Sequence, residues 1–450
     1  MKITFLGAGS TIFSKNVLGD CMASQPLVED GLEISLYDVS PTRLSESERV
    51  IQALNKGLDA RARIKTYLGL EQLKPALKGA DFVVNAVQIG GYDPCTITDF
   101  EIPKKYGLRQ TIADTLGIGG IMRTLRTIPV MEQFGRAMEE ACPDAWLLNY
   151  SNPMAMLTGY MLRYTGVKTV GLCHSVQVCV EHLFRDLGME DKVPGHRELI
   201  AGINHMAWLL DIRDRDGVDL YPEIKRRAKD LSARGGVAHD VGGALLADLV
   251  RYDYIDKLGY YCTESSEHNA EYNPFYIKAR YPELIERFKI PLDEYPRRCV
   301  AQIEGWEKAS RMLLSQDTLA HERSPEYASH IMEAMLTNRP YKIGGNVLNT
   351  GHLIENLPGN ACVEVPCLVD GAGVAPTRVG RLPVQLAAMN MTNINVQQIT
   401  IEAAVTKRRD HIYHAAMLDP HTAAELSIDD IISMVDEMIE AHGDWMPKFH

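Results

Sequence analysis

The sequence predicts an α/β protein in which an N-terminal parallel sheet precedes a mostly helical α+β domain. Three observations lead to this class. Over the first 175 residues, short apolar runs alternate with stretches whose apolar residues have helical spacing. The first run ends in a glycine-containing turn, and after about residue 195 the alternation gives way to mostly helical stretches. A chain of 450 residues is also too long to pack around one small hydrophobic core, so two domains are expected.

The strands of the first domain are predicted where apolar runs stand between polar segments. A helix is predicted at residues 41–55, where apolar side chains recur every three or four positions. Strands that alternate with helices form parallel sheets with right-handed crossovers. The predicted strands are residues 3–6, 33–37, 82–87, 146–148 and 169–172.

The turn after the first strand has the composition of a nucleotide-binding loop. Backbone N–H groups in such a turn approach a pyrophosphate, and the N-terminus of the following helix favours its charge. Asp38, at the end of the second strand, stands where an acidic residue takes the ribose hydroxyls. Ile12 occupies the position of the third glycine of G-x-G-x-x-G, so the fingerprint is incomplete. The predicted cofactor-binding residues are Gly7, Ala8, Gly9, Ser10 and Asp38.

These elements predict a Rossmann-like, NAD-binding domain at residues 1–195 and a catalytic domain at 196–450. This arrangement is like that of lactate and malate dehydrogenases. The last helix is expected to begin after Ser427, a plausible N-cap with Asp430 three residues on. Its apolar face is either core or subunit contact, which makes a homo-oligomer plausible. That face consists of Ile428, Ile431, Ile432, Val435, Met438 and Ile439.

Composition excludes several classes of function. The formal net charge of −12 and the absence of a basic run argue against a nucleic-acid partner. No run approaches the roughly 20 apolar residues that span a bilayer. The first residues lead directly into a strand, unlike a signal peptide, and nine irregularly spaced cysteines do not form a disulfide framework. A cytoplasmic protein with reduced thiols is expected, and no membrane partner.

Two candidate metal ligands are a thiol directly after the fifth predicted strand and an imidazole about 30 residues later. Cys173 and His174 come directly after the strand at 169–172, and open α/β sheets bind ligands at the carboxyl ends of their strands. With His205, Cys173 would give a borderline divalent metal one sulfur and one nitrogen ligand. The structural alternative is a buried cysteine that acts as a small hydrophobic residue. The chain has no C-x-x-C motif here that would favour a metal site over this alternative.

Two further segments offer groups for substrate. Asn152 precedes Pro153, which favours an extended backbone, although a strand-ending turn explains it equally well. Residues 114–126 place Asp114 before three glycines and then a helix that carries Arg123. The glycines favour close approach of a ligand over a solvated surface loop.

Residues 263–274 contain a dense set of proton-transfer groups without lysine or arginine partners. Such clusters are more often solvated helix faces, but the absence of lysine and arginine from this segment favours a functional role. Its members are Glu264, Glu267, His268, Glu271 and Tyr272.

Several segments, taken in this order, resemble family 4 of the glycoside hydrolases over nearly the whole chain. They are residues 7–10, 114–123, 149–154, 171–175, 202–206 and 264–268. The resemblance implies NAD-assisted cleavage, in which NAD⁺ takes a hydride from C3 of the sugar and a base removes the C2 proton. The glycosidic oxygen then leaves C1, water adds, and the hydride returns. A divalent ion, usually manganese, polarises the sugar oxygens.

Residue by residue, the resemblance implies metal ligands at Cys173 and His205 and a substrate-binding asparagine at Asn152. Arg123 is the further substrate candidate. For the proton donor, Asp114 and His174 remain open, because relatives that carry an aspartate after the metal cysteine have His174 there instead. For the base, Glu267 and Tyr272 remain open.

The expected substrate is an unphosphorylated α-galactoside such as melibiose. Relatives of the family act on α-galacturonides, α-glucosides and 6-phospho-glycosides, which are the alternatives within it. An NAD-dependent 2-hydroxyacid dehydrogenase is the alternative from another class, and it would not need a metal. A nucleotide-binding redox sensor, without turnover, is the third.

Overall fold

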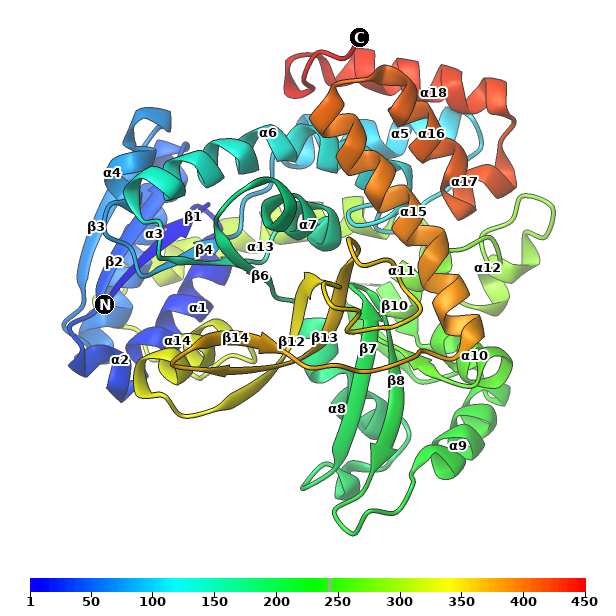
Figure 1. Ribbon diagram of the computed structural model, residues 1–450, viewed down its shortest axis with the longest axis horizontal. Helices are drawn as coiled ribbons and strands as arrows, with labels where there is room; N and C mark the ends of the chain where they lie inside the picture. The colour runs from blue at the N-terminus through cyan, green and yellow to red at the C-terminus, as the bar shows by residue number, and fades with distance from the viewer. Residues whose placement is uncertain (242–243) are drawn as a thin grey trace.

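The computed structural model describes residues 1–241 and 244–450, and one large sheet runs through the molecule (Figure 1). Within the described residues this sheet has 12 strands in the order β11-β8-β7-β13-β12-β6-β5-β4-β1-β2-β3, with β14 beside β13. A separate antiparallel pair is formed by β9 (Ala238–Val241) and β10 (Ala244–Ala247).

The N-terminal part of the sheet is entirely parallel, as the sequence predicts. Every predicted strand is confirmed to within two residues at each end, and β3 at the sheet edge is an addition. The residues of β3 are exposed or half-buried, so the strand has no continuous apolar run that would reveal it. The parallel strands are β1 (Lys2–Leu6), β2 (Glu33–Asp38), β3 (Arg63–Leu68), β4 (Phe82–Asn85), β5 (Trp146–Asn149) and β6 (Lys168–Gly171).

The second half of the chain extends the same sheet with antiparallel strands. This half is rich in helices, as predicted, but two strands from its later part lie between β6 and β7. They are β12 and β13, and they join the sheet through the pairs Gly171–Asn346 and Glu364–Gly202. The antiparallel strands are β7 (Arg197–Ile203), β8 (Met206–Arg213), β11 (Tyr261–Cys262), β12 (Tyr341–Leu348), β13 (Cys362–Asp370) and β14 (Gly373–Pro376).

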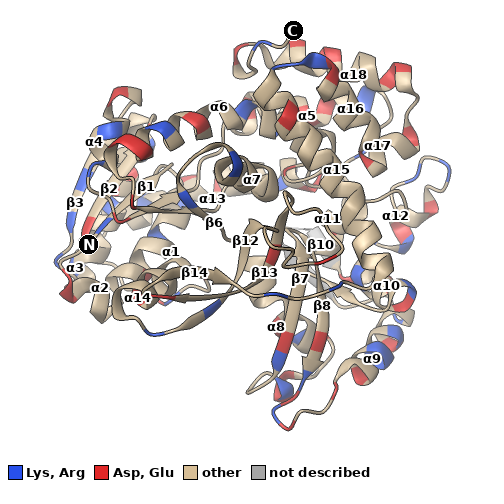
Figure 2. Cartoon of the chain, in the orientation of Figure 1, with Lys and Arg blue, Asp and Glu red and all other residues tan. Residues whose placement is uncertain are grey.

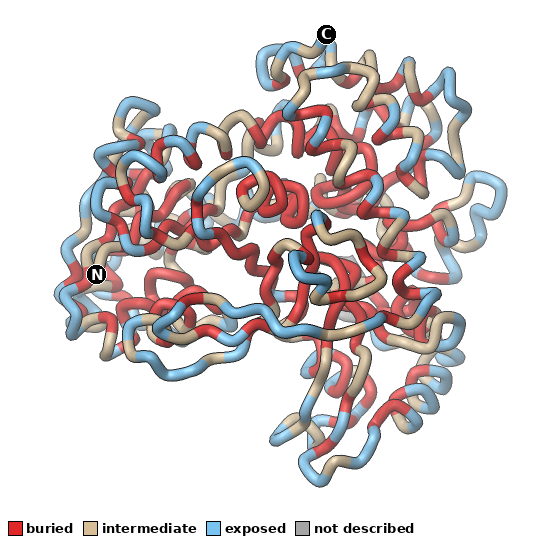
Figure 3. Tube along the Cα trace, viewed as in Figure 1, coloured by how far each residue is buried: buried red, intermediate tan, exposed pale blue. Residues whose placement is uncertain are grey.

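Helices cover both faces of the parallel strands. Side chains alternate between the two faces, so that Phe5 and Val84 pack in the core with α1 and α3, whereas Val83 and Leu147 pack with α6 and α7. Figure 3 shows these buried layers enclosed by exposed loops and outer helices. The helices are α1 (Thr11–Met22), α2 (Gln25–Glu29), α3 (Pro41–Gly57), α4 (Leu73–Leu77), α5 (Ile97–Lys105), α6 (Gly117–Ala141), α7 (Met154–Tyr164), α8 (His174–Asp186), α9 (Tyr221–Ala233), α10 (Leu249–Leu258), α11 (Ser266–Glu271), α12 (Glu283–Arg287), α13 (Glu294–Ser315), α14 (Ala328–Thr337), α15 (Val384–Thr406), α16 (Arg409–Leu418), α17 (Pro420–Glu425) and α18 (Ile428–His442).

One row of directly paired residues crosses the sheet and determines where the site forms. The glycine turn follows the row at Leu6, and Cys173 follows it two residues after Gly171. Carboxyl ends of parallel strands meet at one edge, so the turn and Cys173 lie on the same edge. The row consists of Leu6, Asn85, Asn149, Gly171, Asn346, Glu364 and Gly202.

The C-terminal helix begins where the sequence predicts. The Ser427 hydroxyl accepts a hydrogen bond from the N–H of Asp430, which makes Ser427 the N-cap of α18. The buried face of α18 includes Ile431, Val435 and Met438, and it packs on α5 and α16. Ile428 was expected on this face but is 61% exposed, because it lies in the first turn. The face is therefore core.

Charges are mixed over the surface rather than gathered by sign. Lys, Arg, Asp and Glu alternate along outer helices such as α9 (Figure 2), where Arg226 and Arg227 both pair with Glu223. Among the described residues, no helix combines the length and apolar character needed to cross a membrane. All nine cysteines lie in the described part and are buried free thiols. The domain boundary at residue 195 remains a prediction, and it falls just before β7.

Candidate metal and nucleotide site

The predicted nucleotide turn is built in a way that only glycine permits at its first position. Gly7 has φ +84°, and a Cβ there would lie 2.9 Å from the carbonyl oxygen of Ala86. The N–H groups of Gly7 and Ala8 both donate to the carbonyl of Tyr37, at 3.0 Å each. The turn is therefore fixed against the end of β2.

Asp38 closes this turn with both carboxylate oxygens. One accepts the N–H of Gly9 at 2.7 Å and the other accepts the N–H of Ser40 at 2.8 Å. Each carboxylate oxygen retains acceptor capacity for a ribose hydroxyl. Ser10 makes no side-chain cap on α1, so the first N–H groups of this helix are available to an anion. The turn fits a dinucleotide, and Ile12, 49% exposed, replaces the third glycine on the outer side of α1.

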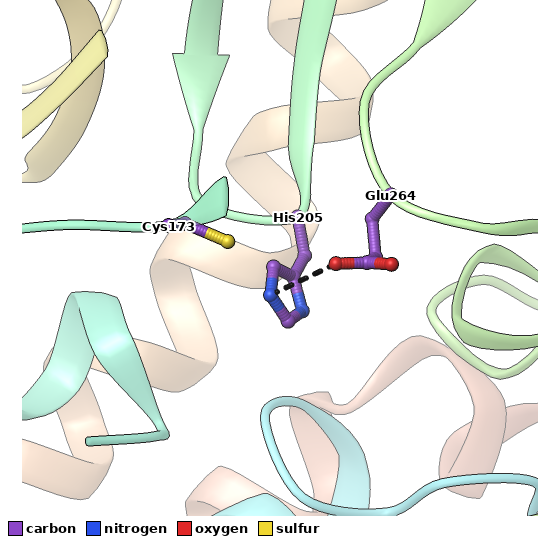
Figure 4. Close-up of side chains that lie close together, drawn as sticks. All are labelled: Cys173, His205 and Glu264. Atoms are coloured by element: carbon purple, nitrogen blue, oxygen red, sulfur yellow. Dashed lines mark ion pairs between the residues drawn. The ribbon is translucent and has the colours of Figure 1, made fainter. Parts of the chain in front are cut away.

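Three side chains with different ligand atoms converge at the candidate metal site (Figure 4). Cys173 follows β6, His205 lies in the turn between β7 and β8, and Glu264 follows β11. Their sulfur, nitrogen and oxygen atoms all lie within 4.8 Å of one another, and His205 Nε2 is 3.2 Å from Glu264 Oε2. His205 and Glu264 have φ values of +63° and +57°, which for non-glycine residues mark a constrained backbone. This donor set fits a borderline divalent cation.

The electrostatics of the three side chains agree with a metal-binding role. Burial lowers the pKa of His205 to about 4, which leaves its imidazole neutral and able to ligate. Burial alone would raise the pKa of Glu264, but His268, His205 and His174 outweigh it and hold that pKa well below its ordinary value. Burial and nearby carboxylates raise the pKa of the Cys173 thiol, an effect that a ligated cation reverses.

Tyr272 orients the imidazole of His205. Its hydroxyl lies 3.0 Å from His205 Nδ1, on the ring nitrogen opposite the one that faces Glu264. A partner on the second nitrogen fixes the tautomer and the ring plane of a metal-binding histidine. Burial raises the pKa of Tyr272 well above its ordinary value. The structure thus places this candidate base behind the imidazole.

Asp114 and His268 form a second polar cluster beside the triad. His268 Nε2 lies 3.9 Å from Asp114 Oδ1, and His268 Nδ1 lies 3.6 Å from Glu264 Oε1 and 2.9 Å from Ser265 Oγ. Burial would lower the pKa of His268, but Glu264 and Asp114 outweigh it and raise that pKa. The two carboxylates thus favour the protonated imidazole of His268.

Arg123 is buried with loose contacts. Its guanidinium lies 3.8 Å from Asp114 Oδ2, 3.4 Å from the Tyr295 hydroxyl and 3.5 Å from Thr96 Oγ1. Its Nε has no hydrogen-bond partner among the described residues. Asn152 Oδ1 is likewise buried and unpartnered in the described structure. Buried polar atoms of this kind are normally satisfied, which suits both side chains to a bound ligand.

Of the three glycines before Arg123, Gly117 has open space at its Cβ position, whereas Gly119 and Gly120 pack against the protein itself. They lie in the first turn of α6, where a Cβ on Gly119 would be 2.4 Å from the oxygen of Ala113. A Cβ on Gly120 would be 2.7 Å from the oxygen of Thr115. These two glycines therefore admit the protein's own Asp114 loop, rather than a ligand.

Glu267 and Glu271 have partners outside the triad. Glu267 forms an ion pair with Arg298 at 2.7 Å, so this candidate base has a partner already. The Glu271 carboxylate accepts the N–H groups of Thr111 and Ala113 at 2.7 and 2.8 Å, next to Asp114. His174 is the exposed first residue of α8.

Glu271 gives the folded protein a specific pH dependence. Burial raises its pKa from 4.5 to about 7, which the backbone N–H groups only partly offset. Because the folded pKa exceeds the unfolded one, this stability contribution is complete below pH 4.5 and is lost as pH rises through 7. We expect the difference in unfolding free energy between wild type and Glu271→Gln to change by roughly 3 kcal/mol between pH 4 and 8. Urea titrations at several pH values measure it, and a pH-independent difference would contradict it.

The structure thus brings together Cys173, His205, Tyr272 and Asp114 of the predicted residues. The sequence pattern did not single out Glu264 as a metal ligand or His268 as the centre of a polar cluster. Their segment carried a signal, because its acidic and histidine residues lack basic neighbours. Tyr295, which contacts Arg123, gave no such signal.

Comparison with known proteins covers the whole chain. The model for "Family 4 glycosyl hydrolase" matches residues 2–189, and that for "Family 4 glycosyl hydrolase C-terminal domain" matches residues 200–422. An α-galactosidase of Bacillus subtilis (strain 168) is 59% identical over 448 residues, covering 100% of this chain and 99% of that protein. An α-galactosidase of Rhizobium meliloti (strain 1021) is 33% identical over 466 residues, covering 100% of this chain and 89% of that protein.

The fold of this chain is also found in solved structures. A 6-phospho-β-glucosidase from Thermotoga maritima, determined with manganese, NAD⁺ and glucose-6-phosphate, has a TM-score of 0.78 at 20% identity. The comparison covers 100% of both chains. The architecture of the two molecules is therefore the same.

Proposed function

The chain belongs to family 4 of the glycosyl hydrolases, and from that premise we propose that it hydrolyses α-galactosides of the melibiose type with the help of NAD and a divalent cation, Mn²⁺ first. The 59% identity to an α-galactosidase along the entire chain supports the substrate. The observation that carries the proposal is the convergence of Cys173, His205 and Glu264 at the same edge of the sheet as the glycine turn. A 2-hydroxyacid dehydrogenase would have no use for these three ligands.

When bound, NAD supplies reversible hydride transfer at the sugar C3, and the cation supplies Lewis-acid polarisation of the neighbouring sugar oxygens. The turn at residues 7–10 and the N-terminus of α1 would hold the pyrophosphate, with Asp38 on the ribose. Cys173, His205 and Glu264 would hold the cation. Tyr272 would keep the His205 ring in place.

The acid and base roles are assigned from the contacts of each side chain. Asp114 is our candidate for the proton donor to the leaving group, because it faces His268 in the buried cluster. His174 is the alternative donor. Glu267 and Tyr272 remain the candidates to remove the C2 proton, and both would first have to leave a present partner, Arg298 or His205.

Charge pairing around the cluster favours an uncharged sugar. Arg123 lies beside Asp114, and Arg298 pairs with both Glu267 and Glu294, at 2.7 and 2.9 Å. A phosphate or carboxylate on the sugar would have to compete with these carboxylates. Arg123 and Asn152 would instead bind sugar hydroxyls. This supports a neutral galactoside over 6-phospho-glycosides and α-galacturonides.

We also propose a cytoplasmic, homo-oligomeric protein in two domains, at residues 1–195 and 196–450. Nine buried free thiols suit a reducing compartment. Exposed apolar residues on α13 support self-association, with Val300, Ile303 and Met312 being 41%, 46% and 60% exposed.

Reconstitution tests the proposed function. Full-length protein stripped of metal and nucleotide should hydrolyse p-nitrophenyl α-galactoside only when NAD⁺ and Mn²⁺ are both added. In D₂O the galactose product should carry deuterium at C2, because a base removes that proton. p-Nitrophenyl β-galactoside is the matched control substrate. Full activity without NAD⁺, or accumulation of NADH from a hydroxy acid, would overturn the proposal.

A further inference from the structure

A buried amide–carboxylate pair lies between the two strands that lead to Cys173 and His205. Asn346 on β12 and Glu364 on β13 are 0% exposed and face each other directly across the two strands. Asn346 Nδ2 donates to Glu364 Oε1 at 2.8 Å. The same Nδ2 lies 3.3 Å from the carbonyl oxygen of Gly171. The two side chains are therefore hydrogen-bonded to each other, and Asn346 also to β6.

Each end of this pair touches a strand that carries a proposed metal ligand. Asn346 pairs with Gly171, two residues before Cys173, and Glu364 pairs with Gly202, three residues before His205. β12 pairs with β6, and β13 pairs with β7, through one residue pair each, so the parallel and antiparallel parts of the sheet are connected to this two-stranded segment only narrowly. The spacing of the two ligand-bearing loops is thus set through Asn346 and Glu364.

The glycines at both ends of this pair leave no room for a side chain. A Cβ on Gly171 would lie 2.8 Å from the Cβ of Asn346. A Cβ on Gly202 would lie 2.6 Å from the carbonyl oxygen of Met206 and 3.2 Å from Oδ1 of Asn390. Gly171 therefore makes room for Asn346, whereas Gly202 makes room for the turn that leads into β8.

Glu364 retains an unsatisfied atom in this buried place. Its Oε2 has no hydrogen bond of normal geometry within the described residues, although the nearby Asn204 side chain still favours the charged form and lowers the pKa of Glu364. A buried carboxylate without a cation is costly, and a hydrophobic pair would fill a sheet interior at lower cost. Burial raises the pKa of Glu364 to about 7, and its charge acts on both Cys173 and Glu264. A divalent cation held by those two side chains would compensate this charge.

We propose that Glu364 is a positioning residue of the metal centre, which together with Asn346 fixes the loops of Cys173 and His205 and adds a buried negative charge that tightens binding of the divalent cation. This inference rests on the proposed function, because it takes the triad as the cation site. Partners just outside the ligands of a metal typically change its affinity 10- to 100-fold when they are replaced.

The experiment measures Mn²⁺ binding rather than turnover. Full-length, metal-stripped protein is titrated with Mn²⁺, free Mn²⁺ is followed by its EPR signal, and NAD⁺ affinity is measured separately. Glu364→Gln keeps the shape and removes the charge. We expect it to weaken Mn²⁺ binding about 10- to 100-fold with NAD⁺ affinity within about twofold of wild type. Asp20→Asn, at a carboxylate 1% exposed in α1 and paired with His321, is the matched control and should bind Mn²⁺ like wild type.

Two further variants separate the possible outcomes. Asn346→Ala removes the bond and keeps the charge, so it tests positioning even where Glu364→Gln does not fold, and it should weaken Mn²⁺ binding at least severalfold. Glu364→Asp should recover part of the loss, because it restores the charge. Mn²⁺ binding within twofold of wild type in Glu364→Gln, or in Asn346→Ala if that alone folds, overturns the inference. Wild type that binds no Mn²⁺ overturns the proposed function together with it.

Discussion

Replacement of Cys173 by serine is expected to remove nearly all Mn²⁺-dependent activity while the fold persists. The sulfur lies within 4.8 Å of the ligand atoms of His205 and Glu264, and serine is a poor replacement for a thiolate ligand. We expect the turnover number to fall by roughly a thousandfold, the rate equivalent of about 4 kcal/mol. Hydrolysis of p-nitrophenyl α-galactoside at saturating NAD⁺ and Mn²⁺ measures it.

The control for this variant is a cysteine buried elsewhere. Cys142 is 5% exposed at the end of α6, and Cys142→Ser should retain activity with both additions. NAD⁺ binding should be unchanged in both variants, because Gly7, Gly9 and Asp38 form the proposed nucleotide turn without Cys173. A Cys173→Ser protein with wild-type activity would remove this residue from the metal site.

Replacement of Asp114 by asparagine should reduce activity most on substrates with poor leaving groups. Asp114 is 9% exposed and accepts a hydrogen bond from Thr115 at 2.7 Å, with His268 and Arg123 on its other sides. A proton donor contributes about 10²- to 10⁴-fold to the rate. Melibiose, whose leaving group is a weakly acidic hydroxyl of glucose, needs this proton more than p-nitrophenyl α-galactoside does, because nitrophenol is a stronger acid.

The measurement compares the turnover numbers of both substrates in wild type and variant. Asp114→Asn should lose on the order of 10³-fold on melibiose and clearly less on the nitrophenyl substrate. Asp144→Asn, at a carboxylate 99% exposed, should behave like wild type on both. Equal losses on the two substrates would exclude Asp114 as the proton donor and transfer that role to His174.

Both halves of the proposed site were predictable in outline because their signals are local. Gly7 and Gly9 stand between two strands that are recognisable by their apolar runs, and only glycine tolerates the backbone at Gly7. Cys173 follows such a strand directly, which by itself places it at the ligand-binding edge of a parallel sheet. Glu264 gave no comparable signal, since it became a ligand candidate only when β11 paired with β8 beside His205.

The sequence by itself determined five of the six parallel strands, the glycine turn after β1, the position of Cys173 and the cap of α18 at Ser427. Each depends on residues that are close together in the chain, where the burial of apolar side chains and backbone sterics decide the conformation. The tertiary structure alone decided that β12 and β13 enter the sheet between β6 and β7, that Glu264 joins Cys173 and His205, and that His268 faces Asp114. Those contacts join segments dozens to more than a hundred residues apart. They depend on strand order and register, which local patterns do not encode.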